Sequence, residues 1–321
     1  MAVRIPMVVK RGGATPSAGW VRPADWLAIP EIAAGEEVVY SLMSVRNVVG
    51  NFAAVKFGGD YTVDWGDGNI ENVASGVKAE HQYAWADVGD VTSEGFRQAL
   101  IKVTPQAGSN ITSVDLQEYH SVIGDDASSQ FIDLVMNIPN VSGTNLVIGG
   151  ATIYHRLIER VWIKEIGAVT SMNRMFNGCY SLQSVPLFDT SSVEDMRYMF
   201  YNCTSLQTVP LFDTSIVENM YQMFRYCYSL QSVPLFDTSS VTDMRNMFDA
   251  CYSLQRNQMT GTKVSFDMSD SIMSAAAIDE LGGNVADLTG ETSRTVNLTG
   301  NYGVADADLT IWTNKNWTVI S

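Results

Sequence analysis

The stretch that decides the fold is VPLFDTSSVEDMRYMFYNCTSL, residues 185–206. The same pattern recurs over about residues 169–256, and its cysteines stand at positions 179, 203, 227 and 251, a constant step of 24 residues. Four apolar columns keep this step: Met172, Met196, Met220 and Met244; Met175, Met199, Met223 and Met247; Phe176, Phe200, Phe224 and Phe248; Leu182, Leu206, Leu230 and Leu254. A fixed period in the twenties with apolar columns is typical of a solenoid of stacked coils.

Each 24-residue coil divides into two halves. Apolar residues recur at i, i+3, i+6, i+7 and i+10 from Val193 to Cys203, which predicts a short helix, and Thr190 and Ser191 precede it as suitable N-caps. Residues 206–212 follow with the apolar spacing of a leucine-rich-repeat strand. We therefore expect an α/β solenoid in which a parallel sheet is backed by short helices.

The cysteines and aspartates of the repeat allow several chemical interpretations. Metal sites need ligands clustered within a few residues, and a step of 24 residues supplies no such cluster. Disulfides between neighbouring coils are an alternative, but stacked side chains point in parallel, so we expect reduced thiols that fill one buried column. Asp189, Asp213 and Asp237 form another column, and we expect them to cap helices. The sequence thus predicts no metal and no cofactor.

The segments on either side of the regular repeats are expected to continue the solenoid over residues 107–321 as irregular capping coils. Their apolar spacing predicts strands at 111–116, 145–148, 161–163, 264–268, 295–298 and 317–320, and helices near 131–136, 154–159, 272–281 and 305–312. We therefore expect one solenoid from residue 107 to the end of the sequence.

Residues 36–106 lack this period and alternate apolar and polar residues over short runs, which predicts a small antiparallel β-sandwich. The run YTVDWGDG, residues 61–68, resembles the W-G-D-G motif of polycystic-kidney-disease-type (PKD) domains, and His81 and Tyr83 stand where that family has a His-x-Tyr strand. The resemblance implies a tight Gly-Asp-Gly turn and a tryptophan packed in the core. We therefore interpret the two aspartates of the motif and His81 as structural rather than as a catalytic or metal cluster.

Residues 1–35 are predicted to form an extended basic arm. The first 30 residues carry four basic side chains and one acidic side chain, whereas the whole chain has a net charge of −15. Trp20 and Trp26 have no core of their own in such an arm, so we expect them, with Arg22, to dock onto a partner. A solvated tail is the alternative. The first apolar run is short and interrupted by charge and proline, which is unlike a signal peptide.

The repeat pattern V-P-x-F-D-T-S-x-V-x-x-M-x-x-M-F-x-x-C-x-S-L resembles the BspA-type leucine-rich repeats of bacterial surface proteins. Residues 185–206 match it throughout, and the match extends over residues 169–255. The resemblance implies a BspA-like leucine-rich-repeat fold and adhesion to host proteins and surfaces rather than catalysis.

The two ends of the chain resemble another group of proteins. Residues 3–27 are similar to the start of structural proteins of tailed bacteriophages, and residues 299–320 to the terminal coils of phage fibre and virion proteins. This resemblance implies a virion surface protein, a fibre or adhesin or a capsid or tail decoration protein, assembled in the host cytoplasm. Its partners would be other virion structural proteins, further copies of itself as a homo-oligomer, and a host-surface glycan or protein.

Net charge, the length of the apolar runs and the absence of catalytic motifs argue against several classes of function. A net charge of −15 repels nucleic-acid phosphates, and no apolar run approaches the roughly 18 residues that cross a bilayer, so we expect neither nucleic-acid binding nor membrane insertion. The chain has no P-loop, nucleophile elbow, HExxH or CxxC motif, so we expect no enzyme and assign no catalytic residue. Two alternatives stay open: a bacterial cell-surface adhesin and a polysaccharide-degrading enzyme that uses paired carboxylates.

Positions that vary between coils indicate which face could bind a partner. They lie beside the Met/Phe stripe and are rich in tyrosine and arginine, which are common in recognition surfaces. The residues expected to bind are Tyr198, Tyr201, Tyr221, Tyr226, Tyr228, Arg197 and Arg225. Aromatic rings with arginines nearby suit sugar rings that carry hydroxyl or acidic groups. A solvated face that is free to vary is the alternative.

Overall fold

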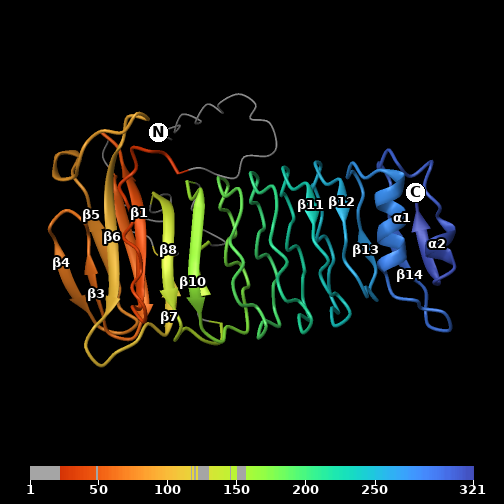
Figure 1. The fold of residues 1–321 in the computed structure, drawn as a ribbon, viewed down its shortest axis with the longest axis horizontal. Helices are drawn as coiled ribbons and strands as arrows, with labels where there is room; N and C mark the ends of the chain where they lie inside the picture. Colours follow the sequence, from red (N-terminus) through yellow and green to blue (C-terminus); the bar gives the residue numbers. More distant parts are fainter. Residues whose placement is uncertain are drawn as a thin grey trace.

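The computed structural model describes residues 22–47, 50–116, 118, 121, 130–144, 146–149 and 157–321. Along the long axis of the molecule, two β-sheets are followed by a stack of narrow coils and then by a cap of helices and a small sheet (Figure 1). One apolar core runs through all three parts, from Val39 to Trp317.

The larger sheet has six strands in the order β10-β8-β1-β6-β3-β4. Their bounds are β1 Val38–Val45, β3 Tyr61–Asp64, β4 Ile70–Val73, β6 Arg97–Pro105, β8 Phe131–Ile138 and β10 Arg160–Ile166. Neighbouring strands pair antiparallel except β8 and β10, which pair in parallel. The parallel arrangement continues into the coils, where the bridge between Ser171 and Asp195 is also parallel.

The smaller sheet has four strands in the order β5-β2-β7-β9. Their bounds are β2 Phe52–Gly58, β5 Lys78–Gln82, β7 Ser113–Asp115 and β9 Leu146–Val147, and the 3₁₀ turn η1, Trp85–Asp87, follows β5. Both sheets contribute to the shared core, for example through Val55 of β2 and Val103 of β6. The alternating pattern of residues 36–106 predicts strands, and this segment forms β1 to β6; each sheet also contains strands from the segment that follows.

The helix predicted near residues 131–136 is wrong, because this segment forms β8. All eight residues of the strand are buried, and β1 and β10 hydrogen-bond to its two edges. Asp133 and Asn137 interrupt the apolar run four residues apart, which is the spacing of one helical turn, so the pattern does not distinguish a strand buried on both faces from a buried helix. Of the helix predicted near residues 154–159, residues 154–156 lie outside the described residues.

The helix predicted in each coil is also wrong. Residues 193–203 and their equivalents form a series of turns whose backbone groups bond to the next coil, as when the N–H of Tyr198 donates to the carbonyl of Tyr221 at 3.0 Å. A right-handed helix needs negative φ, whereas φ is 56° at Tyr198 and 64° at Asn202. The repeat is therefore a β-solenoid whose coils are joined by backbone hydrogen bonds.

The strand half of each coil is shorter than predicted. Within the regular repeats, the described strands are β11, Ser232–Val233, and β12, Arg256–Asn257, which pair in parallel. Earlier coils keep one bond at this position, for example from the N–H of Gln207 to the carbonyl of Gln183 at 3.0 Å. The pairing stops because prolines follow at positions 186, 210 and 234, and proline has no N–H to donate.

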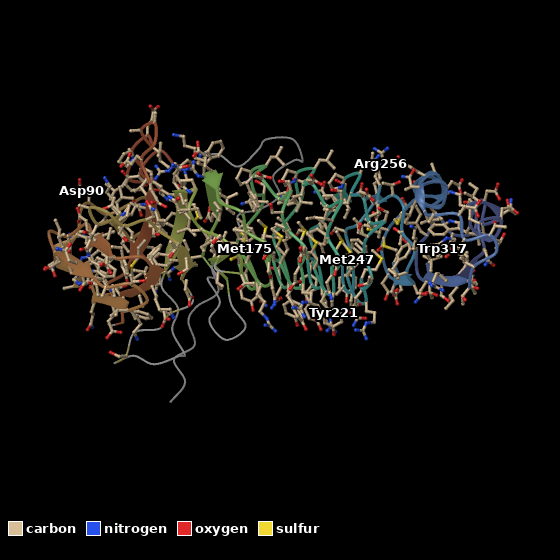
Figure 2. The ribbon with its side chains drawn as sticks, turned by 90° about the horizontal axis from the view of Figure 1, so that it is seen from below. Asp90, Met175, Tyr221, Met247, Arg256 and Trp317 are labelled. Carbon is tan, nitrogen blue, oxygen red and sulfur yellow. The ribbon has the colours of Figure 1, made fainter. Side chains whose placement is uncertain are left out.

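The interior of the coils is built from the apolar columns, and Met247 lies between the two long edges of the stack in Figure 2. The ring of Phe200 stacks between those of Phe176 and Phe224, with centroid separations of 5.3 and 5.6 Å. All four cysteines are free and buried, as predicted. Their thiols also join the coils, since Cys203 Sγ donates to the Phe176 carbonyl at 3.1 Å and the next two cysteines repeat this contact.

The C-terminal cap closes the open end of the core. It consists of β13 Phe266–Asp267, β14 Arg294–Asn297 and β15 Trp317–Ile320, which pair in parallel, with α1 Ala275–Asn284 and α2 Thr310–Thr313. The rings of Trp312 and Trp317 are buried and pack edge to face at 6.1 Å. Gly282 permits this packing, because a Cβ there would lie 2.5 Å from Trp312 Nε1. The helices and strands predicted in this segment are confirmed, with shifted bounds.

Candidate binding surface

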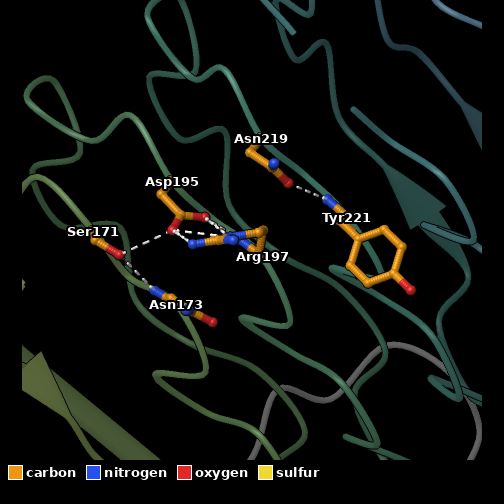
Figure 3. A network of polar contacts seen from close by, with 6 residues as sticks. All are labelled: Ser171, Asn173, Asp195, Arg197, Asn219 and Tyr221. Carbon is orange, nitrogen blue, oxygen red and sulfur yellow. Dashed lines mark hydrogen bonds and ion pairs between the residues drawn. The ribbon is translucent and has the colours of Figure 1, made fainter. Parts of the chain in front are cut away.

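A turn that repeats in each coil positions the first of the predicted binding residues. The side chain of Asp195 accepts the backbone N–H of Arg197 at 3.0 Å, and that of Asn219 accepts the N–H of Tyr221 at 3.0 Å (Figure 3). Short polar side chains close turns by accepting the N–H two residues further on. The turn therefore fixes the direction in which Arg197 and Tyr221 leave adjacent coils.

Six tyrosines from adjacent coils form one continuous aromatic surface. Ring centroids lie 5.3 Å apart for Tyr221–Tyr198, 5.7 Å for Tyr198–Tyr201, 5.4 Å for Tyr201–Tyr226, 6.2 Å for Tyr226–Tyr228 and 5.7 Å for Tyr228–Tyr252. We call these six residues the tyrosine surface. Tyr221 lies on the opposite side of the coils from Arg256 (Figure 2).

The five tyrosines predicted to bind thus lie together, and binding itself stays a prediction. Tyr252 was not among the predicted residues, although it stands 24 residues after Tyr228 in the repeat. Its side chain is 54% exposed, against 43% for Tyr228. The repeat step was therefore the signal that could have found it.

Three arginines lie over rings of the tyrosine surface. We give the distance from the guanidinium carbon to the ring centroid for each pair. It is 4.7 Å for Arg174 and Tyr198, 4.6 Å for Arg225 and Tyr226, and 5.4 Å for Arg245 and Tyr221. Cation–π contacts of this kind hold both partners in place. Arg174 and Arg245 were not predicted, although both occupy positions that vary between coils.

Carboxylates hold most of these cations. Arg225 pairs with Asp249 at 2.7 Å and Arg245 with Asp243 at 2.7 Å, and the hydrogen bond from Arg245 lowers the pKa of Asp243. The predicted Arg197 is bound to Asp195 at 2.8 Å (Figure 3). Within the part of the chain that the structure describes, Arg174 has no carboxylate partner within ion-pair distance. Among the described residues of this surface, Arg174 is therefore the arginine that no carboxylate holds.

The strand side of the coils carries a second regular feature. Leu187, Leu211 and Leu235 form an exposed column, with exposed fractions of 63%, 55% and 52%. Two residues further on, the aspartates predicted to cap helices instead close turns, since Asp189 Oδ1 accepts the N–H of Ser191 at 2.9 Å. This side offers apolar contact with little variation between coils.

Two of the three residues predicted to dock onto a partner contact the six-stranded sheet of the same chain. Trp20 lies outside the described residues. Trp26 is 5% exposed and packs in an apolar cluster with residues of β1 and β8, and Arg22 Nε donates to the buried Asp133 at 3.0 Å. The expectation that a partner covers Trp26 is therefore wrong, because the six-stranded sheet of the same chain covers it. Docking by this segment stays a prediction.

The W-G-D-G motif is engaged in structural contacts. Trp65 is buried and stacks on His81 with centroids 5.2 Å apart, while His81 Nε2 lies 2.6 Å from Asp67 Oδ2. The hydroxyl of Tyr83 donates to the Trp65 carbonyl at 2.9 Å, and the carboxylate of Asp64 accepts the N–H of Gly66 at 3.0 Å. These contacts fix the turn and the tryptophan, as the resemblance implies.

The described residues hold neither a candidate metal cluster nor a candidate membrane-spanning helix. No group of three or more histidine, cysteine, aspartate or glutamate side chains in that part of the chain could hold a metal ion. None of the helices there is both long enough and apolar enough to span a membrane.

Two family profiles match the chain. The profile described as BspA type leucine rich repeat region matches residues 101–207 in six copies, and the one described as Mycoplasma protein of unknown function, DUF285, matches residues 160–280. Neither the curated proteins nor the solved structures contain a match. The chain is thus similar to BspA-type leucine-rich-repeat proteins, and its solenoid fold is typical of surface and binding proteins rather than enzymes.

Proposed function

We propose that this chain is a non-enzymatic binding protein that presents the tyrosine surface to its partner. The observation that carries the proposal is the continuity of six tyrosine rings and three guanidiniums across adjacent coils. Tyrosine and arginine dominate recognition hot spots. Backbone hydrogen bonds and stacked phenylalanines hold the coils in place, so little ordering is needed when a partner binds.

The further proposal is that the chain is a bacteriophage virion surface protein, a fibre or adhesin or a capsid or tail decoration protein. It rests on the resemblance of residues 3–27 and 299–320 to phage structural proteins and on the PKD-like motif at residues 61–68. Other virion proteins would bind the N-terminal segment, and a host-surface glycan or protein the tyrosine surface. A BspA-like adhesin on the bacterial cell is the second candidate, favoured by the family match over residues 101–207.

Location separates the two candidates. Mass spectrometry of purified phage particles and antibody labelling of intact, uninfected cells measure where the chain resides. Its presence in particles supports the virion protein. Its presence on the surface of uninfected cells, and not in particles, favours the adhesin.

The double variant Tyr198→Gln/Tyr221→Asn tests the binding face. Glutamine and asparagine already occupy the equivalent positions 222 and 173, so the coils tolerate them. We expect attachment to target cells to fall at least tenfold, about 1.4 kcal/mol, while the melting curve shows that the variant is still folded at the temperature of the assay.

Two controls accompany this variant. Tyr302→Gln removes a tyrosine that is 69% exposed in the C-terminal cap, and Leu211→Gln interrupts the exposed leucine column. Both should attach like the unaltered protein. Unchanged attachment by the double variant, or loss caused by Leu211→Gln alone, would contradict the proposal.

A further inference from the structure

The carboxylates of the tyrosine surface that the structure describes are bound by arginines, while its tyrosine hydroxyls can each donate a hydrogen bond. Asp195, Asp243 and Asp249 are each bound by an arginine. The amide of Gln222 donates to the hydroxyl oxygen of Tyr221 at 2.8 Å, so that hydroxyl keeps its own proton to donate outward. The guanidinium of Arg174 also faces this surface without a carboxylate among the described residues. A ligand that complements the surface therefore supplies acceptors and negative charge.

We propose that the tyrosine surface binds a linear acidic polysaccharide, with an acid group of the ligand, a carboxylate or a sulfate, on Arg174. The inference rests on the proposed binding function and names its ligand class. Sugar rings would pack their C–H faces on the more exposed rings, Tyr228 and Tyr252, and their oxygens would accept from the arginines and tyrosine hydroxyls.

The spacing of the rings supports a linear ligand that runs along the coils. Three pairs of rings bridge adjacent coils. The distance between the two ring centroids is 5.3 Å for Tyr198–Tyr221, 5.4 Å for Tyr201–Tyr226 and 5.7 Å for Tyr228–Tyr252. The last pair is parallel within 4°. A polysaccharide is also a stiff chain of rings with a similar step, so successive sugars can meet successive coils at a small ordering cost.

Charge favours a sparsely acidic ligand over other polyanions. The chain has a net charge of −15, and nucleic acids carry a phosphate at every nucleotide, so most of their phosphates would be repelled. Because the described residues leave Arg174 without a carboxylate, the surface suits a ligand with one acid group among several neutral oxygens. An acidic peptide offers the same charge but loses more conformational freedom when it is ordered.

Binding of defined probes to the full chain tests the inference. Biolayer interferometry would compare an oligogalacturonate in which most carboxylates are methyl esters, a sparsely sulfated cello-oligosaccharide, the neutral cello-oligosaccharide, oligo-dT and polyglutamate. We expect one of the two acidic glycans to bind at least tenfold more tightly than the other three probes. Whether the carboxylated or the sulfated glycan binds more tightly identifies the acid group. Arg174→Gln should weaken that binding at least tenfold. The coils tolerate this change, because Gln222 occupies the equivalent position with φ of 54° against 62°.

Arg256→Gln is the matched control, since Arg256 is an exposed arginine on the opposite side of the coils (Figure 2). It should bind the acidic glycan like the unaltered chain. Equal binding of neutral and acidic glycans, tighter binding of oligo-dT or polyglutamate, or equal effects of the two arginine variants would overturn the inference. Loss of cell attachment by Tyr198→Gln/Tyr221→Asn without glycan binding would overturn this inference alone and leave the proposed function standing.

Discussion

Replacing Phe200 by leucine tests whether ring stacking between coils stabilises the solenoid. Phe200 is fully buried and contacts three rings, those of Phe176, Phe212 and Phe224, at 5.3, 6.4 and 5.6 Å. Phe248 is also buried, but among the described residues its ring contacts that of Phe224 alone, at 6.0 Å. Leucine keeps most of the apolar volume at either site, so the loss of volume costs both variants about 1 kcal/mol.

The two variants then differ by two ring contacts. Each aromatic pair contributes about 0.5–1.5 kcal/mol beyond its buried area. Phe200→Leu should therefore destabilise the protein by about 1–3 kcal/mol more than Phe248→Leu. Urea unfolding followed by circular dichroism measures the difference. The m-values of the two variants must agree, because stepwise unfolding of the coils would change the m-value. Equal destabilisation by the two variants would refute the stacking argument and leave burial alone as the source of stability.

Three further outcomes follow from the structure. Burial raises the pKa of all four cysteine thiols, so a thiol reagent should label them only after unfolding, and rapid labelling of the native protein would contradict the buried column. Burial alone would raise the pKa of Glu80, but hydrogen bonds from Ser121 and Lys78 lower it to about 2, below the ordinary 4.5. The stability that this carboxylate contributes is therefore complete above pH 4.5 and is lost as the pH falls toward 2, and Glu80→Gln should flatten acid unfolding curves in that window. Removal of residues 1–30 should lower the stability by about 3–5 kcal/mol more than removal of residues 1–21 does, because only the longer deletion removes the buried Trp26. Equal melting of the two truncated chains, measured by calorimetry, would show that the tryptophan contributes nothing.

The sequence was sufficient to predict the solenoid, its period and its core, because a column that repeats every 24 residues fixes which side chains stack. It was not sufficient to predict the backbone conformation within each coil. The spacing from Val193 to Cys203 fits a helix as well as it fits this coil. The positive φ at Tyr198 and Asn202, which is 56° and 64°, and the hydrogen bonds between coils distinguish the two. A glycine, which would signal positive φ, stands at the position of Asn202 in one coil, as Gly178 with φ of 74°, but not in the coils that follow.

The sequence predicted the tyrosines of the candidate site but not the partners of its arginines. Comparison of the repeats identified the side of the coil on which the tyrosines lie, because side chains at equivalent positions share a direction. It could not show which arginines are held by carboxylates. Arg197 was predicted to bind a partner but is held by Asp195 in its own coil, whereas Arg174, which was not predicted, has no carboxylate partner among the described residues.

The hydrogen bonds between coils have a consequence for how such a protein can change in length. Each regular coil bonds only to the coil before it and the coil after it, as Tyr198 does to Tyr221, and the same backbone conformation recurs at each step. Loss or duplication of one 24-residue unit therefore joins two compatible coil faces and leaves the two-sheet end and the C-terminal cap as they are. A gene that duplicates this unit would lengthen its recognition surface by one row of side chains at a time, and each new row would be free to acquire its own tyrosine or arginine.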